Sequence, residues 1–166
     1  KHTDELYKKI IKVSPNIIKS SNYKKLVKKR IVERGTNTSL NKILTINEYE
    51  EGNLDIKDER TILNKLKKAI PKVDLVIVQD FGHGFFTKKI KDLLQKNSKK
   101  LSINVQTNSL NYGFNIINKQ YKKAKIFSID ERELELFTSS KELDHKKCLK
   151  DLTYKINAKK GFLTCG

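Results

Sequence analysis

The stretch that decides the fold runs from Val73 to Gly84 and reads Val-Asp-Leu-Val-Ile-Val-Gln-Asp-Phe-Gly-His-Gly. Residues 73–78 form a short apolar run rich in β-branched residues, which is typical of a strand buried on both faces of a parallel sheet. Residues 80–84 bring an aspartate and two glycines and predict a loop. The stretch therefore predicts a buried strand whose carboxyl end carries a loop at the place where ligands bind in open α/β sheets.

Strand and helix patterns alternate on the carboxyl side of this stretch. Apolar residues at helical spacing before it predict a helix that ends at Pro71, and Thr87 is expected to cap the helix after it. Three further strands are expected at residues 101–105, 124–129 and 161–164. A polar loop is expected after the first of these strands, and two helices are expected between the second and the third. This alternation predicts an α/β domain with a parallel sheet and right-handed crossovers.

The amino-terminal part of the chain has a different pattern. Residues 26–34 and 40–49 have the composition of two strands, which could form a hairpin or a small accessory sheet. The sequence is therefore interpreted as one partial domain, residues 1–166, with accessory strands at about 26–49 and an α/β core at 56–166. The sequence contains no methionine and stops just after a predicted strand, so we expect a fragment of a longer protein.

The net charge of the chain bears on the partners that it could bind. The formal net charge is +17, which raises nucleic acid as a partner. Residues 1–70 carry a net charge of +8 and residues 71–166 a net charge of +9, so the excess of lysine is spread evenly along the chain. Evenly spread lysine is the pattern of a solvated surface, and we expect no specific nucleic-acid partner.

Cysteine content and hydropathy bear on the compartment. Cys148 and Cys165 form no Cys-x-x-Cys pair and have no histidine at metal-binding spacing. A reduced, cytoplasmic setting is expected. No apolar run approaches ~18 residues, so no membrane span or membrane partner is expected.

The loop after the first strand admits two readings. Gly82 and Gly84 flank His83, and such glycines let the backbone approach a ligand closely, beside a helix start that offers unpaired N–H groups to an anion. The same glycines also suit a tight turn from strand to helix. From these residues alone, the two readings of the Asp80 loop stay open.

Two later strand ends also carry polar residues. Asp130 and Glu133 have the spacing of a capping box, which explains them structurally, and they could also hold a magnesium ion near phosphates through waters. Thr164 and Gly166 follow the last strand and could contact a nucleotide phosphate. The chain shows no Gly-x-Ser-x-Gly, His-Glu-x-x-His or P-loop motif.

Taken in order, these pieces resemble the PfkB (ribokinase-like) carbohydrate kinases. Residues 76–84 are similar to the strand and Asp-Tyr-Gly-Lys-Gly segment of the heptose-phosphate kinase branch. Residues 128–133 fall where the family has Thr-Pro-Asn-x-x-Glu, and residues 164–166 where it has Thr-x-Gly. Lys29-Arg30-Ile31-Val32 and the strand after it resemble part of the β-sheet lid over the sugar.

The resemblance implies a doubly wound, mostly parallel ribokinase-like fold and phosphoryl transfer from Mg-ATP to a sugar or sugar-phosphate hydroxyl. Asp130 and Glu133 would organise magnesium and phosphate, and Thr164 and Gly166 would line the nucleotide site. The loop of Asp80, Gly82, His83 and Gly84 would lie near the sugar and the phosphates. Lid strands in this family often pair between subunits, which makes a homodimer possible.

Three departures from the family pattern bear on activity. Asp130 replaces an asparagine and adds negative charge close to phosphate. His83 replaces a lysine, so a permanent positive charge becomes partial near neutral pH. The family's Gly-Ala-Gly-Asp segment, which supplies the catalytic aspartate, does not occur in the chain. The sequence therefore predicts no catalytic residue here, and the chain alone is expected to be inactive.

An alternative function follows from the same departures. The chain could be a kinase-fold domain that has lost catalysis and serves as a binding or scaffolding part of a larger protein. Gln106-Thr107-Asn108 and residues 111–115 are similar to a sub-branch in which the kinase domain is joined to a nucleotidyltransferase-like domain.

Overall fold

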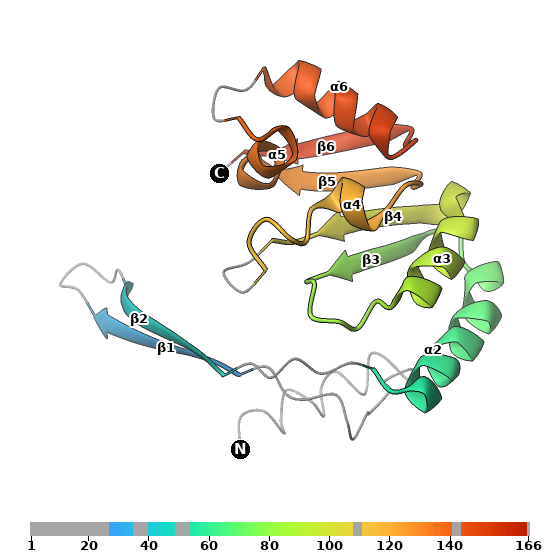
Figure 1. Ribbon diagram of the computed structural model, residues 1–166, viewed down its shortest axis with the longest axis horizontal. Coiled ribbons are helices and arrows are strands. Elements are labelled where there is room, and N and C mark those ends of the chain that lie inside the picture. Colours follow the sequence, from blue (N-terminus) through green and yellow to red (C-terminus); the bar gives the residue numbers. More distant parts are fainter. Residues whose placement is uncertain (1–26, 35–39, 49–53, 108–110, 141–143, 166) are drawn as a thin grey trace. The chain divides into compact units, whose positions relative to one another are not determined.

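The computed structural model describes residues 27–34, 40–48, 54–107, 111–140 and 144–165 (Figure 1). The chain divides into two compact units, residues 1–50 and residues 51–166, and each is described by itself.

The first unit contains an antiparallel hairpin. Strand β1 (Val27–Arg34) pairs with strand β2 (Leu40–Glu48), and the register shifts between Ile31 and Val32. The two predicted strands are confirmed. Ile43 is 66% exposed and Leu44 is 50% exposed, so the ribbon shows apolar side chains to solvent. Because a two-stranded ribbon is marginally stable in water, this surface suits contact with another element.

The second unit is built on a four-stranded parallel sheet (Figure 1). Its strands are β3 (Val76–Asp80), β4 (Leu101–Val105), β5 (Ile126–Asp130) and β6 (Lys160–Thr164). They are hydrogen-bonded in the order β3-β4-β5-β6, each parallel to the next. The predicted parallel α/β sheet is confirmed.

Helices fill the connections of this unit. They are α2 (Ile56–Ala69), α3 (Lys88–Lys96), the single turn α4 (Ile117–Gln120), α5 (Glu131–Thr138) and α6 (His145–Lys155), with 3₁₀ turns η1 (Ile70–Lys72) and η2 (Ser98–Lys100). Helix α2 ends just before Pro71, as predicted. The hydroxyl of Thr87 accepts the N–H of Ile90 and so caps α3, which confirms that prediction too.

The core lies between one face of the sheet and these helices. Alternate strand residues point into it, which is the period-2 pattern expected of a strand. The sheet contributes Val78, Ile103, Phe127 and Ile129, and the helices contribute Ile90, Leu94, Leu134 and Leu152, all at 3% exposure or less.

The opposite face of the sheet is open among the described residues. Ile77 is 67% exposed and Phe162 is 53% exposed, although both belong to paired strands. The prediction that residues 73–78 are buried on both faces is therefore wrong, and the strand itself begins only at Val76. The strand order also runs in one direction, so right-handed crossovers place the connecting helices on one face. The doubly wound arrangement is thus not seen in the described part of the chain.

Among the described residues, no helix is both long enough and apolar enough to span a bilayer.

Candidate functional site

The carboxyl edge of the sheet brings together three of the predicted polar segments. Asp80 ends β3 and lies opposite Val105 of β4, while Asp130 ends β5 and lies opposite Thr164 of β6. The backbone N–H of Gln106 donates to the carbonyl of Asp80 at 2.9 Å, which ties the first two strand ends together. Gly166 lies outside the described residues.

Asp80 is buried and its carboxylate is fully engaged by the protein. Its side chain accepts the backbone N–H of Gly82 at 2.9 Å and the hydroxyl of Tyr121 at 3.0 Å. The ammonium of Lys91 lies 3.6 Å from the same oxygen that Tyr121 contacts. The carboxylate therefore holds the loop against the core, which is a structural role for Asp80.

Tyr121 and Lys91 were not predicted from the sequence as partners of Asp80. Tyr121 is fully buried, and the Lys91 ammonium lies 5.6 Å from the centroid of its ring and also contacts Gln120. Burial, with Asp80 as a second cause, raises the pKa of Tyr121, so the phenol stays a hydrogen-bond donor. Nothing in the local sequence pattern marks these contacts, since the two side chains lie 41 and 11 residues from Asp80.

Two asparagine side chains hold the backbone of the Asp80 loop through hydrogen bonds. The amide of Asn111 donates to the carbonyl of Phe81 at 2.9 Å, and the amide of Asn115 donates to the carbonyl of Gln106 at 3.0 Å. Asn115 is 5% exposed and also reaches the carbonyl of Asp80 at 3.5 Å. The polar segment after β4 thus supports the loop after β3, a role that the sequence did not reveal.

Both glycines of the loop adopt left-handed backbone conformations, with φ of +70° at Gly82 and +81° at Gly84. The imidazole of His83 is stacked on the Phe81 ring, with centroids 6.5 Å apart. His83 is half-buried, and the stacking joins two side chains of the same loop. Both glycines therefore suit the backbone conformation of this loop, and Asp80 and Gly82 also make the hydrogen bond that holds it.

Replacing Gly82 by alanine is expected to lower the free energy of unfolding by about 2–3 kcal/mol, from left-handed strain and crowding together. The added Cβ would lie 2.2 Å from Asn111 Nδ2 and 2.6 Å from Asn115 Cγ. Urea denaturation followed by circular dichroism measures the loss.

Gly113 is the matched control for this substitution. Its φ is +79°, but an added Cβ would meet no atom within 4 Å, so Gly113→Ala is expected to lose only the strain term of ~1 kcal/mol. Equal losses at the two positions would show that the asparagines do not confine Gly82.

Asp130 and Glu133 form the predicted capping box at the start of α5. Asp130 Oδ1 accepts the N–H of Glu133 at 2.7 Å, and Glu133 Oε2 accepts the N–H of Asp130 at 3.2 Å. The second oxygen of Glu133 accepts the N–H of Thr107, from the end of β4, at 2.9 Å. Glu133 is 7% exposed, and burial raises its pKa despite these two backbone donors.

The two carboxylates therefore differ in whether they can still bind a ligand. Both oxygens of Glu133 are occupied by backbone donors, while Asp130 is exposed and uses one oxygen for the cap. Thr164 is also exposed, and its hydroxyl lies 3.4 Å from the carbonyl of Ile129. Asp130 and Thr164, on adjacent strand ends, are the predicted residues that remain open to a ligand.

The described residues contain no group of three or more histidine, cysteine, aspartate or glutamate side chains that could hold a metal ion. Magnesium is commonly held by one or two carboxylates, waters and the substrate's phosphates, and Asp130 suits that mode. Neither protein-family models nor curated proteins yield a match to this chain.

Proposed function

We propose that this chain is part of an ATP-dependent sugar or sugar-phosphate kinase of the PfkB (ribokinase-like) type, which transfers the γ-phosphoryl group of Mg-ATP to a sugar hydroxyl. The observation that carries the proposal is the gathering of the Asp80 loop, the Asp130 cap and Thr164 at one edge of a parallel sheet. Ligands bind at that edge in open α/β sheets.

The chain's own residues would contribute positioning and charge neutralisation, on which phosphoryl transfer chiefly depends. Asp130 would bind magnesium through waters, since its carboxylate is exposed. Glu133 would act as a positioning residue, because its two bonds to Thr107 and Asp130 tie the ends of β4 and β5 together. Thr164 would contact a nucleotide phosphate through its hydroxyl.

The hydroxyl proton of the sugar must go to a base that this chain lacks. In the family, the aspartate of Gly-Ala-Gly-Asp fills that role, and the chain holds no such segment. The chain alone is therefore expected to bind Mg-ATP without phosphorylating a sugar. Turnover is therefore assayed with the full protein that the gene encodes, as ATP consumption across sugars and sugar phosphates.

The substitution Asp130→Asn gives a sharp test of the nucleotide site. Asparagine keeps the helix cap and removes a negative charge beside the phosphates. We expect metal-free ATP to bind several-fold more tightly to the variant, from ~1 kcal/mol of relieved repulsion, and the dependence of binding on magnesium to weaken. Calorimetric titration with ATP, with and without magnesium, measures both.

Asp55→Asn is the matched control, because Asp55 caps α2 in the same way, accepting the N–H of Asp58 at 2.7 Å. It is expected to leave ATP binding unchanged. A chain that binds no ATP with or without magnesium, together with an encoded protein that turns over no sugar, would refute the kinase proposal.

A second candidate is a kinase-fold domain without catalysis, which binds or scaffolds within a larger protein, such as one that also carries a nucleotidyltransferase-like domain. This candidate is favoured because the carboxylate oxygens of Asp80 and Glu133 accept hydrogen bonds from donors of the protein itself. ATP binding by the encoded protein without turnover of any sugar would select this candidate. In either case the exposed apolar ribbon of β1 and β2 could pair two copies.

A further inference from the structure

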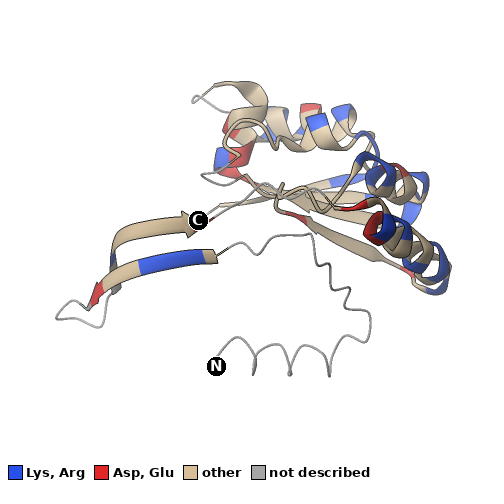
Figure 2. Ribbon diagram, turned by 60° about the horizontal axis from the view of Figure 1, so that its bottom comes forward, with Lys and Arg blue, Asp and Glu red and all other residues tan. Residues whose placement is uncertain are grey.

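The loops that precede the four strands are strongly basic. Segments 70–75, 96–100, 122–125 and 155–160 together contain ten lysines and one aspartate. Because the strands are parallel, all four loops lie at the amino-terminal edge of the sheet, which we call the lysine edge. In Figure 2, blue segments crowd the side from which the strands start.

Two strand-end segments at the opposite edge have the reverse balance. Segments 80–87 and 130–133 contain four carboxylates and one arginine. The strand-end loops of the two edges therefore differ in the sign of their charge, although the charge excess is even along the sequence. Such a fixed concentration of one sign of charge raises the local potential and attracts a partner of the other sign.

Backbone hydrogen bonds hold the basic loops side by side. The N–H groups of Lys159 and Lys160 both donate to the carbonyl of Lys125, at 3.0 and 3.3 Å, and the N–H of Lys125 donates to the carbonyl of Leu101 at 2.7 Å. The N–H groups of Lys122 and Lys123 donate to the side chain of Gln95. The lysines are thus displayed from an ordered row of loops.

These positive charges are not neutralised within the described part of the chain. The ion pairs found there involve Lys29, Lys89, Lys91 and His145, none of which belongs to the lysine edge. Most of the ten ammonium-bearing side chains are exposed. A surface of this kind stays available to an external polyanion.

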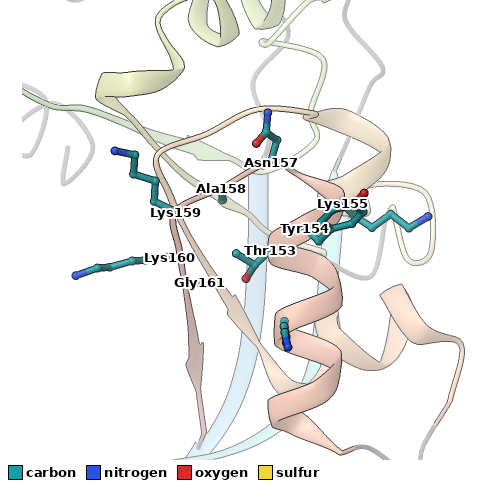
Figure 3. A pocket seen from close by; sticks show the side chains of 9 residues that line it. Thr153, Tyr154, Lys155, Asn157, Ala158, Lys159, Lys160 and Gly161 are labelled. Atoms are coloured by element: carbon teal, nitrogen blue, oxygen red, sulfur yellow. The ribbon is translucent and has the colours of Figure 1, made fainter.

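The lysine edge also contains an open concavity of 730 Å³ between the end of α6 and the start of β6. Tyr154, which is 87% exposed, lies on its lining with Lys155, Lys159 and Lys160. Figure 3 shows Lys159 and Lys160 extending to one side and Tyr154 and Lys155 to the other. Because the ammonium groups do not converge, the concavity suits an extended anion better than a single small one.

We propose that the lysine edge binds single-stranded nucleic acid without sequence preference, with a base stacked on Tyr154 and the phosphates following the lysines. Strands ~4.8 Å apart give the edge a length of roughly 14 Å, enough to contact the phosphates of a few successive nucleotides. A basic groove with an exposed aromatic platform is the general means of binding single strands. The proposal does not rest on the kinase function, which concerns the other edge.

The surface fits other polyanions less well. A membrane partner calls for apolar side chains that insert between lipids, and the concavity offers one aromatic residue with lysines around it. An acidic protein would use the lysines but would leave Tyr154 without the flat partner that a base supplies. Nucleic acid uses both features together.

The test is the binding of a labelled, mixed-sequence DNA single strand to the 166-residue chain, followed by fluorescence anisotropy over a range of salt concentrations. A variant with Lys122→Gln, Lys123→Gln, Lys159→Gln and Lys160→Gln is expected to bind more weakly. If all four lysines contact phosphates, the slope of log affinity against log salt should fall by about 3.

The matched control changes four other exposed lysines, Lys57, Lys88, Lys146 and Lys147, to glutamine. They lie in the first turns of α2, α3 and α6, at the far end of the helices from the lysine edge. This variant has the same net charge as the first, and its slope is expected to change by less than 1. Equal weakening by the two variants would show diffuse attraction and overturn the proposal.

Tyr154→Ser separates stacking from charge. Because the side chain is exposed, the substitution should not disturb folding. It is expected to weaken single-strand binding about tenfold while leaving the salt slope and duplex binding unchanged. No loss of single-strand affinity would remove the stacking role. Binding to anionic lipid vesicles or polyglutamate, without binding to the strand, would assign the lysine edge to another partner and overturn the proposal.

Discussion

Replacing Asp80 by alanine is expected to lower the free energy of unfolding by about 3–5 kcal/mol, the usual loss when one partner of a buried ion pair is removed. Asp80 is 3% exposed, and Lys91 beside it is largely buried. The substitution leaves the Lys91 ammonium, the Tyr121 hydroxyl and the N–H of Gly82 without their common acceptor. Urea denaturation followed by circular dichroism measures the loss.

Tyr121→Phe, alone and combined with Asp80→Ala, separates the contributions to this network. Tyr121→Phe keeps the buried ring and removes one hydrogen bond to a charged group, so ~1.5–3 kcal/mol is expected. The double variant with Asp80→Ala should lose less than the sum of the single losses, because both remove the same contact. A loss below 1.5 kcal/mol for Asp80→Ala would mean that the network does not hold the loop to the core.

Phe127→Ala is expected to be comparably severe, at about 3–5 kcal/mol, because it removes a large core side chain. Phe127 is fully buried in β5, opposite Ile103 of β4 and Gly161 of β6. Its ring fills the space above Gly161, where an added Cβ would lie 2.3 Å from the ring. The same denaturation experiment measures the loss.

The contact between Phe127 and Gly161 supplies an internal check. Gly161→Ala alone is expected to cost about 1–3 kcal/mol through crowding, and nearly nothing in a chain that already carries Phe127→Ala. Ile77→Ala, on the open face of the sheet at 67% exposure, should cost less than 1 kcal/mol. Additive losses for the Phe127 and Gly161 substitutions would contradict a direct contact between these two residues.

Local patterns in the sequence were enough to predict the elements of the second unit. The end of α2 before Pro71 and the cap at Thr87 are local features found where they were expected, whereas the strand before Asp80 begins later than expected, at Val76. Burial was harder to predict. The run that includes Ile77 reads as buried on both faces, but whether a second face is covered depends on the connections between strands rather than on the strand itself.

The residues of the candidate site also fall into two groups, those that local sequence patterns predict and those that they do not. Its members at strand ends could be predicted, because the carboxyl ends of parallel strands meet at one edge. The capping box of Asp130 and Glu133 could be predicted too, since it spans a single turn. Tyr121, Lys91 and Asn115 could not, because their contacts with the Asp80 loop join residues far apart in the chain.

The sequence by itself determined the alternation of strands and helices, the polar residues at the strand ends and the excess of 17 positive charges. Only the tertiary structure decided what those residues touch and where that charge lies. Two carboxylates that looked available for ligands, Asp80 and Glu133, are taken up by donors from other segments. Ten lysines from four separate segments of the chain gather at one edge, because helical crossovers return every parallel strand to the same starting side.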